Sequence, residues 1–379
     1  MLIDCRRFGA AAVGGTFLAI SSLGVSLAAS QNASTPSTSS ASSSTTSADS
    51  STSKTSKTAK STATTAARPA ATTSKTTTSS TVSHTTAARA QSAARARAAA
   101  TVQARLQQDA MTAHFKRDEL GNIVPDVRAA AAIVYNPTTG EVIWEENSHE
   151  ERSIASLTKV MTAVTFVADD PDLTQRVAVT RADLVGASTT YLRAGELVSY
   201  NDLLHLALIA SDNAAARILA RTSEGGTAAF VVRMNDMATH LGLSNTHYAD
   251  PSGLNPDDMS SAYDLSHLIA FASSDDRLGP IMRTAEYEVH TSQRDIEIHS
   301  TNKLLGTDVD VRAGKTGFIS KAGYCLATLL QVPQGSQIAV VVLGASNSTT
   351  RFWEARHLFN WFVSRGQGIV GGEPPHVSK

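Results

Sequence analysis

The chain changes character near residue 119, and this change limits where a folded domain can form. Residues 30–118 consist largely of Ser, Thr and Ala and contain few large apolar side chains. Such a segment cannot bury enough apolar surface to offset the entropy lost on ordering. We therefore predict a disordered spacer there, with a helix as the alternative for Ala87–Gln108. The folded domain is expected at 119–368, followed by a short tail at 369–379.

Net charge is divided unevenly between these parts. The whole chain of 379 residues carries −1. Residues 30–117 hold eleven Lys or Arg against two Asp, which is +9, and 118–379 hold −11 once the +1 of 1–29 is counted. A basic segment of this kind is typical of a solvated tail, or of attraction to an anionic envelope polymer or a membrane surface. We expect no nucleic-acid partner.

The first 29 residues have the pattern of an export signal. Arg6 and Arg7 form a short positive region, and Phe8–Ala29 is apolar or small. Ser26–Ala28 suits cleavage after small residues. The alternative is an uncleaved anchor, because the stretch is nearly long enough to span a bilayer. Both interpretations predict an exported protein that is periplasmic, associated with the cell wall, or held at the membrane by its N-terminus.

Hydrophobic patterning in the folded part predicts strands at both ends and helices between them. Ala129–Tyr135 and Glu141–Glu145 flank a turn at Asn136–Gly140 and form a hairpin. The expected helices are Ser156–Ala168, Asn201–Arg221, Thr227–Leu241, Asp264–Ser273 and Arg351–Phe362, and the expected late strands are Tyr324–Leu330 and Ile338–Leu343. This order predicts an α/β (α+β) fold in which the last strands of an antiparallel sheet return beside the first. Cys325 is expected as a small buried residue that forms no disulfide with Cys5.

Three polar motifs follow one another in this part of the chain. Ser156–Lys159 reads Ser-Leu-Thr-Lys and precedes an apolar helix. Residues three apart on a helix share a face, so the lysine can reach the serine hydroxyl, and the helix dipole favours negative charge at its N-terminus. Such pairs also arise by chance, as at Ser51/Lys54 and Ser300/Lys303. The structural alternative is an N-cap serine with an exposed lysine.

The other two motifs are Ser211–Asn213, which reads Ser-Asp-Asn, and Lys315–Gly317, which reads Lys-Thr-Gly. The first falls between two apolar helical stretches, where polar side chains need partners. The second precedes an apolar run expected to be an inner strand, and its glycine would let a substrate backbone approach closely. Ordinary turns are the structural alternative for both motifs. Their order after a Ser-x-x-Lys pair favours a shared cleft.

These motifs and their surroundings resemble the low-molecular-weight penicillin-binding serine D-alanyl-D-alanine peptidases. The resemblance covers about residues 123–365. It includes Ser153–Ala163, Asp250–Leu254, Thr301–Leu305 and Gly314–Phe318. It implies a β-lactamase/transpeptidase-like fold, in which an antiparallel sheet flanked by helices adjoins a mostly helical subdomain and the active site lies between them.

The resemblance also implies the catalytic roles. Ser156 would be the acylated nucleophile, with Lys159 as its base, kept neutral by burial and by the positive Lys315. Ser211 would relay the proton toward the leaving amine. The backbone N–H groups of Ser156 and Phe318 would form the oxyanion hole.

Five residues are implied for substrate binding alongside Phe318. Asn213 would hold the lysine and the substrate amide, and Lys315 would supply positive potential. Thr316 would bind the substrate carboxylate, Gly317 would allow close approach, and Arg351 matches a position that often carries a carboxylate-binding arginine. Its alternative is an exposed arginine at the start of a helix. No cofactor is expected, and the histidines form no metal-ligand pattern.

The function implied is a serine D,D-peptidase that hydrolyses D-Ala-D-Ala or D,D cross-link bonds of peptidoglycan stem peptides and is acylated by β-lactams. Carboxypeptidase is the preferred label. D,D-endopeptidase is the alternative, because no second β domain follows residue 365 and the chain resembles the compact members, which include D,D-endopeptidases. A β-lactamase is disfavoured because no Glu-x-x-Leu-Asn lies between Asn213 and Lys315. A wall-binding or penicillin-sensing module without turnover is the remaining alternative.

Overall fold

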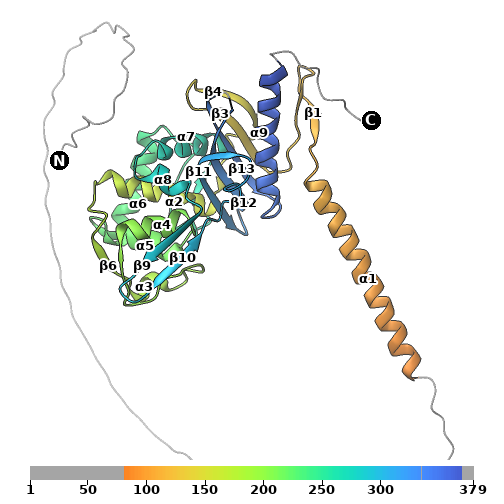
Figure 1. The fold of residues 1–379 in the computed structure, drawn as a ribbon, viewed down its shortest axis with the longest axis horizontal. Helices are drawn as coiled ribbons and strands as arrows, with labels where there is room; N and C mark the ends of the chain where they lie inside the picture. Colours follow the sequence, from red (N-terminus) through yellow and green to blue (C-terminus); the bar gives the residue numbers. More distant parts are fainter. Residues whose placement is uncertain (1–80, 334, 369–379) are drawn as a thin grey trace, which may run out of the picture. The chain divides into compact units, whose positions relative to one another are not determined.

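The computed structural model of the chain describes residues 81–333 and 335–368 (Figure 1). The predictions for residues 1–29 and 369–379, and most of the predicted spacer, lie outside the described residues. The described helices are α1 Thr81–Ala110, the 3₁₀ turn η1 Ala155–Leu157, α2 Thr158–Ala168, α3 Arg181–Leu184, α4 Tyr200–Leu208, α5 Asn213–Thr222, α6 Gly226–His240, α7 Ala262–Ser273, α8 Leu278–Met282 and α9 Thr350–Gly368.

A five-stranded antiparallel sheet forms the centre of the folded part, in the order β11-β12-β13-β3-β4. Its strands are β3 Ala131–Asn136, β4 Glu141–Glu146, β11 Asp310–Ile319, β12 Gly323–Gln331 and β13 Gln337–Ala345. The pairing of β13 with β3, for example Val341 with Ile133, confirms that the last strands return beside the first. The expected hairpin is also present, and its turn is closed by the Asn136 Oδ1, which accepts from the Thr138 N–H at 2.9 Å.

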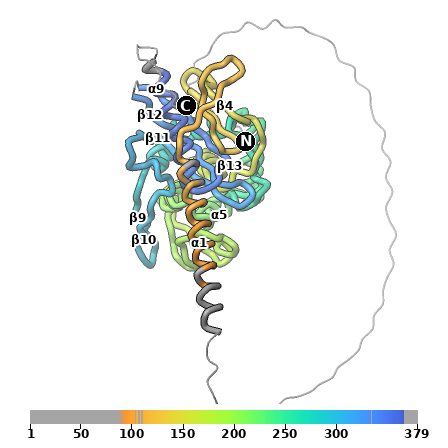
Figure 2. The backbone as a smooth tube through the Cα atoms, turned by 90° about the vertical axis from the view of Figure 1, so that its right-hand side faces the viewer, coloured from red at the N-terminus to blue at the C-terminus, as the bar shows by residue number. Residues whose placement is uncertain are grey.

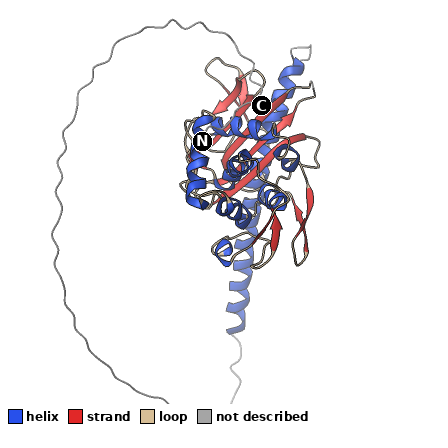
Figure 3. Cartoon of the chain, turned by 90° about the vertical axis from the view of Figure 1, so that its left-hand side faces the viewer, coloured by secondary structure: helices blue, strands red, loops and turns tan. Residues whose placement is uncertain are grey.

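Alternation along the strands separates two apolar layers, because successive side chains of a strand point to opposite faces. In β3, Ile133 belongs to the core shared with α2 and α7, whereas Val134 belongs to the core shared with α9. Helix α9 contacts β12 and β13 on one face, and α7 contacts β3, β12 and β13 on the other. The strands of the sheet therefore lie between helices, as Figure 3 shows.

The remaining elements lie at the edge of this sandwich. The helical subdomain comprises α3 to α6, with α2 packed against α4, α5 and α6. The shorter strands form two-residue to five-residue pairs: β1 Phe115–Arg117 with β2 Ile123–Pro125, β5 Arg152–Ser153 with β8 Met259–Ser260, β6 Arg176–Ala178 with β7 Leu197–Ser199, and β9 Glu286–His290 with β10 Asp295–His299. The hairpin of β9 and β10 can be followed in Figure 2.

Three features differ from the sequence expectation. The helix expected over Asn201–Arg221 is divided into α4 and α5, because Ser211 adopts a left-handed conformation with φ of 61°. The β9–β10 hairpin was not expected at all. The N-terminal boundary also shifts, since β1 pairs with β2 and so extends the folded part back to Phe115.

Helix α1 falls within the range predicted as spacer, where a helix over Ala87–Gln108 was the alternative. Its high Ala and Arg content favours helix by propensity. In the described part of the chain, no helix has both the length and the apolar character needed to cross a membrane.

Candidate active site

The turn that carries Ser156 is closely packed against the segments that contain Gly253 and Gly317. Ser156 lies in η1, so the α-helix begins two residues later than expected, at Thr158. The Thr158 hydroxyl donates to the Ala155 carbonyl at 2.8 Å and stabilises the change from one helix type to the other. A Cβ at Gly253 would lie 2.1 Å from the Ala155 carbonyl oxygen, and one at Gly317 would lie 2.8 Å from the Ile154 carbonyl oxygen. Only glycine fits at these two positions. Gly317 was expected to allow the close approach of a substrate backbone, and here it allows the close approach of the turn that carries Ser156.

Lys159 lies on the first turn of α2 and is completely buried. Its Nζ donates to the Ser156 Oγ at 2.9 Å, to the Asn213 Oδ1 at 2.6 Å and to the Ser252 carbonyl at 2.5 Å. Three acceptors on three different segments fix the amine in one position. Sequence reasoning predicted the contacts with Ser156 and Asn213, and it missed the one with Ser252.

The electrostatic state of Lys159 follows from its burial. Burial lowers the pKa of its amine from the usual 10.5 to about 7, although the charges of Asp212, Asp250 and Asp258 act in the opposite direction. The positive charge of Lys315 was expected to help lower the pKa of Lys159. The effect runs the other way: the charge of Lys159 lowers the pKa of Lys315, as the second cause after the burial of the Lys315 amine. In its neutral form the amine has two N–H groups, which can serve the Asn213 and Ser252 oxygens, and a lone pair that can accept the proton of the Ser156 hydroxyl, 2.9 Å away.

The Ser211 turn is held by capping and backbone bonds. The Asp212 carboxylate accepts from the Ala215 N–H at 2.9 Å and caps α5. The Asn213 amide donates to the Ala187 carbonyl at 2.7 Å, which orients its Oδ1 toward Lys159. The turn therefore presents two side chains to the site, Ser211 and Asn213.

Lys315 and Thr316 lie on the edge strand β11. The Lys315 Nζ donates to the Ser211 Oγ at 2.8 Å and to the Thr316 carbonyl at 2.8 Å. The Thr316 hydroxyl donates to the Thr301 Oγ1 at 2.7 Å. The apolar run that follows the Lys-Thr-Gly motif was expected to be an inner strand, and it forms the inner strand β12, whereas the motif itself lies on β11.

Two further predicted site residues differ in burial: Phe318 is exposed and Arg351 is buried. The Phe318 side chain is exposed and stacks on Tyr324 with 4.2 Å between ring centroids. Arg351 is buried on α9, and its Nη1 donates to the carbonyls of Gly317 at 3.0 Å and Cys325 at 3.2 Å. This contradicts the alternative of an exposed arginine, and it joins α9 to β11 and β12. Cys325 is buried and free, as expected.

Hydrogen bonds thus join Lys159 to Ser156 and Asn213, and Lys315 to Ser211. Sequence reasoning gave no role to two groups that support these residues. Thr301 bonds Thr316, and the Asp258 Oδ1 accepts from the backbone N–H groups of Ala249 and Asp250 at 2.6 and 3.0 Å. Burial raises the pKa of Asp258 to about 7. Of these two residues, only Thr301 lies in a segment that had been noted, and it was noted for its family resemblance.

A metal centre has little support among the described residues. The one group whose ligand atoms lie close enough is Glu286, Glu297 and His299 on the β9–β10 hairpin, and all three are exposed. Exposed acidic clusters are common on protein surfaces and carry no chemistry by themselves.

Comparison with known proteins places this geometry in one family. Residues 118–347 match the peptidase S11 family, described as D-alanyl-D-alanine carboxypeptidase. The D-alanyl-D-alanine endopeptidases of Pseudomonas aeruginosa and Escherichia coli are 32% and 31% identical to the chain, over 62% of it and over 77% and 78% of their own lengths. The D-alanyl-D-alanine carboxypeptidase DacD of Escherichia coli is 33% identical, over 62% of the chain and 63% of its own length.

Solved structures give the same result for the fold. The DD-transpeptidase of Streptomyces K15 is 26% identical, with a TM-score of 0.61, and the match covers 63% of this chain and 98% of that one. This likeness confirms the predicted sheet with an adjoining helical subdomain.

Proposed function

Because the chain belongs to the D-alanyl-D-alanine carboxypeptidase family and is a serine D,D-peptidase, we propose that Ser156 is its nucleophile and Lys159 its general base. The observation that carries this proposal is the 2.9 Å contact between the two side chains. Burial lowers the pKa of the Lys159 amine in this contact to about 7. A serine hydroxyl is a poor nucleophile until a neighbouring base accepts its proton.

In the acylation step, the Ser156 Oγ forms a bond to the carbonyl carbon of a D-alanine, and its proton passes to the Lys159 Nζ. The C–N bond to the next residue then breaks, and the leaving amine takes up a proton through Ser211. Water hydrolyses the resulting ester and restores the free serine. The Lys315 Nζ donates to the Ser211 Oγ at 2.8 Å, and this supports the assignment because the bond fixes the position of the relay hydroxyl.

The substrate would lie along the edge strand β11. The backbone N–H groups of Ser156 and Phe318 would stabilise the oxyanion, and the Thr316 hydroxyl would bind the substrate carboxylate. The exposure of Phe318 is consistent with a position beside bound peptide. Asn213 would hold both Lys159 and the substrate amide.

Arg351 has weaker support as a direct carboxylate ligand. Its guanidinium donates to the Gly317 and Cys325 carbonyls, so it is already engaged behind the strand. We propose that it acts through its charge, which adds positive potential beside Lys315 and lowers the pKa of that amine.

The bond cleaved defines two candidate activities. Carboxypeptidase activity was the preferred expectation, and the matched family bears that description. D,D-endopeptidase activity is the alternative, and the matched relatives of Pseudomonas aeruginosa and Escherichia coli bear that name. Incubation of the full chain with a pentapeptide ending in D-Ala-D-Ala, and separately with a D,D-cross-linked dimer, distinguishes them by which product mass forms.

The other two candidates are separated by turnover. A β-lactamase would hydrolyse a chromogenic cephalosporin rapidly, whereas a peptidase would consume about one molecule per protein and then recover slowly. A penicillin-sensing module would form the adduct but release no product from either peptide. The absence of Glu-x-x-Leu-Asn between Asn213 and Lys315 disfavours the β-lactamase.

We also propose that the protein is exported, on the basis of residues 1–29, and that the basic segment 30–117 approaches an anionic envelope polymer or membrane surface. Mass spectrometry of the native N-terminus tests the first point. A peptide containing Phe17 in the mature protein would exclude cleavage and leave the anchor.

The central experiment labels the full chain with a fluorescent penicillin and identifies the modified peptide. The proposal expects the label on Ser156, and no label on a folded Ser156→Ala variant. Label on any other residue, or on the alanine variant, would contradict the assignment. Ser300→Ala is the matched control, because Ser300 and Lys303 have the same spacing as Ser156 and Lys159. This variant should be labelled like the wild type.

A further inference from the structure

The β9–β10 hairpin spans from one side of the site to the other. Just beyond the end of β10, the Thr301 N–H donates to the Ile209 carbonyl at 3.1 Å, beside the Ser211 turn. The Thr301 Oγ1 accepts from Thr316 on β11 at 2.7 Å. The base of the hairpin is thereby anchored to both the helical and the strand side of the cleft.

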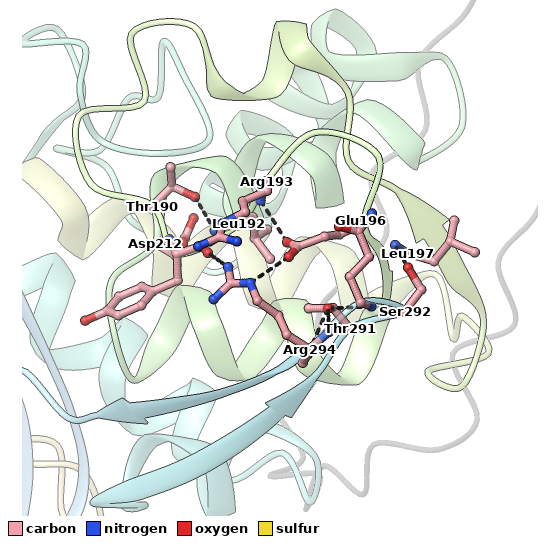
Figure 4. A network of polar contacts seen from close by, with 11 residues as sticks. Thr190, Leu192, Arg193, Glu196, Leu197, Asp212, Thr291, Ser292 and Arg294 are labelled. Carbon is pink, nitrogen blue, oxygen red and sulfur yellow. Dashed lines mark hydrogen bonds and ion pairs between the residues drawn. The ribbon is translucent and has the colours of Figure 1, made fainter.

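The tip of the hairpin is a tight turn that docks on another loop. The Thr291 N–H donates to the Arg294 carbonyl at 3.0 Å and closes the turn. The Leu197 N–H donates to the Ser292 Oγ at 2.9 Å, and the Ser292 N–H donates to the Leu197 carbonyl at 3.0 Å. Figure 4 shows these contacts at the junction of the hairpin with the loop that precedes β7.

A buried ion pair lies at the centre of this junction. The Arg294 Nε donates to the Glu196 Oε1 at 2.8 Å, and the other carboxylate oxygen accepts from the Arg193 N–H at 2.8 Å. The Arg294 Nη2 also donates to the Tyr191 carbonyl. Glu196 has no exposed side-chain surface, and Arg294 retains 29%. Desolvation makes such a pair costly unless its hydrogen bonds are satisfied, and here they are.

The segment reached by Arg294, residues 187–191, is bonded to the Ser-Asp-Asn turn along its whole length. The Tyr191 N–H donates to the Asp212 Oδ2 at 2.6 Å. The Asn213 N–H donates to the Thr189 carbonyl at 3.0 Å, and its side chain donates to the Ala187 carbonyl at 2.7 Å. We call residues 187–191 the collar. It has no regular secondary structure of its own, so its position depends on its contacts.

We propose that Arg294 and Glu196 are positioning residues for the peptidase reaction: they fix the collar, and the collar holds Asn213 against Lys159. The inference rests on the proposed roles of Asn213 and Lys159. It makes the hairpin tip, although it touches none of the proposed catalytic side chains, a determinant of the acylation rate. A displacement of about 1 Å at a reacting group can slow a reaction by ~10²-fold, so a loosened collar is expected to slow acylation by roughly tenfold.

The discriminating variant is Arg294→Lys. Lysine can still pair with Glu196, but it cannot also donate to the Tyr191 carbonyl with the geometry of a guanidinium. Arg221→Lys is the matched control: Arg221 pairs with the buried Asp183 and donates to a backbone carbonyl in the same way, but it does not contact the collar.

The experiment measures the saturating rate of penicillin acylation of the full chain, at a temperature where thermal melting shows every variant to be folded. We expect Arg294→Lys to reduce this rate roughly tenfold with little change in half-saturating penicillin, and Arg221→Lys to stay within about twofold of the wild type. Arg294→Ala should be at least as slow as Arg294→Lys.

The possible outcomes are distinct. A wild-type rate in Arg294→Lys overturns the inference, whatever Arg294→Ala does. Acylation would then not depend on the hydrogen bond from Arg294 to the Tyr191 carbonyl of the collar. An equal loss in Arg221→Lys also overturns it, since any half-buried arginine of the subdomain would have the same effect. A wild-type chain that is not acylated at all would instead refute the proposed function.

Discussion

The pH dependence of acylation is the most direct consequence of the burial of Lys159. Its pKa of about 7, against the usual 10.5, means that about half of the molecules hold the neutral amine at pH 7, compared with roughly one in 3000 for an ordinary lysine. This difference corresponds to ~5 kcal/mol of preference for the neutral form. Because the base must be neutral, acylation should be lost as the pH falls through about 7.

The expected profile follows from the neutral fraction. Between pH 8 and pH 6 the acylation rate should fall about tenfold, and between pH 8 and pH 10 it should change little. A lysine with its ordinary pKa would give a rise of about 75-fold over the second interval instead. The assay is the pseudo-first-order rate of labelling by a fluorescent penicillin, measured on the full chain at concentrations below saturation.

A rate that keeps rising tenfold per unit above pH 8 would refute the reasoning, since Lys159 would then be charged at neutral pH. A flat profile from pH 6 to 8 would also refute it. The control is Lys303→Ala, which removes the exposed lysine of the chance Ser300/Lys303 pair. Its profile should superimpose on that of the wild type.

Three further outcomes are expected. Gly253→Ala should lower the melting temperature and slow acylation at least tenfold, because its Cβ would lie 2.1 Å from the Ala155 carbonyl; Gly306→Ala shares a positive φ but has nothing within 4 Å, and it should only mildly destabilise the protein. Lys159→Met should abolish acylation of Ser156 in a folded protein, as judged by labelling and circular dichroism. The folded pKa of Lys159 lies below its unfolded value, so the unfolded state holds the extra proton between about pH 7 and 10.5 and wild-type stability rises with pH there. Urea unfolding at pH 7 and pH 9 should therefore show the wild type gaining roughly 2 kcal/mol relative to Lys159→Met, and an unchanged difference would argue against the low pKa.

The motifs could be predicted from the sequence because each one is a short contiguous signal. Ser156 and Lys159 are linked by helical spacing, and the apolar runs on either side of Pro333–Gly335 are recognisable as strands. The return of the last strands beside the first followed from the placement of strands at both ends. The structure confirms these expectations for the described residues.

The supporting contacts could not be predicted, since they join backbone groups that are distant in sequence. The carbonyl of Ser252 gives no signal of its partnership with Lys159, because every residue has a carbonyl. The left-handed Ser211 divides a stretch whose composition favours one continuous helix. The charges of Glu196 and Arg294 resemble ordinary surface charges until the fold brings the hairpin tip to the collar.

The pairing of β13 with β3 has a consequence for biogenesis. Strand β3 pairs with β13, for example Val134 with Val340, and β13 is synthesised some two hundred residues after β3. Long-range pairing of this kind is slow, and until it forms the chain exposes a bare apolar strand edge. The Ser156 turn, likewise, is packed by Gly317 from the late part of the chain. A nascent polypeptide that ends before β11 would therefore have the nucleophile segment and no reactivity. Penicillin labelling would then also report, molecule by molecule, that synthesis and folding had passed β11.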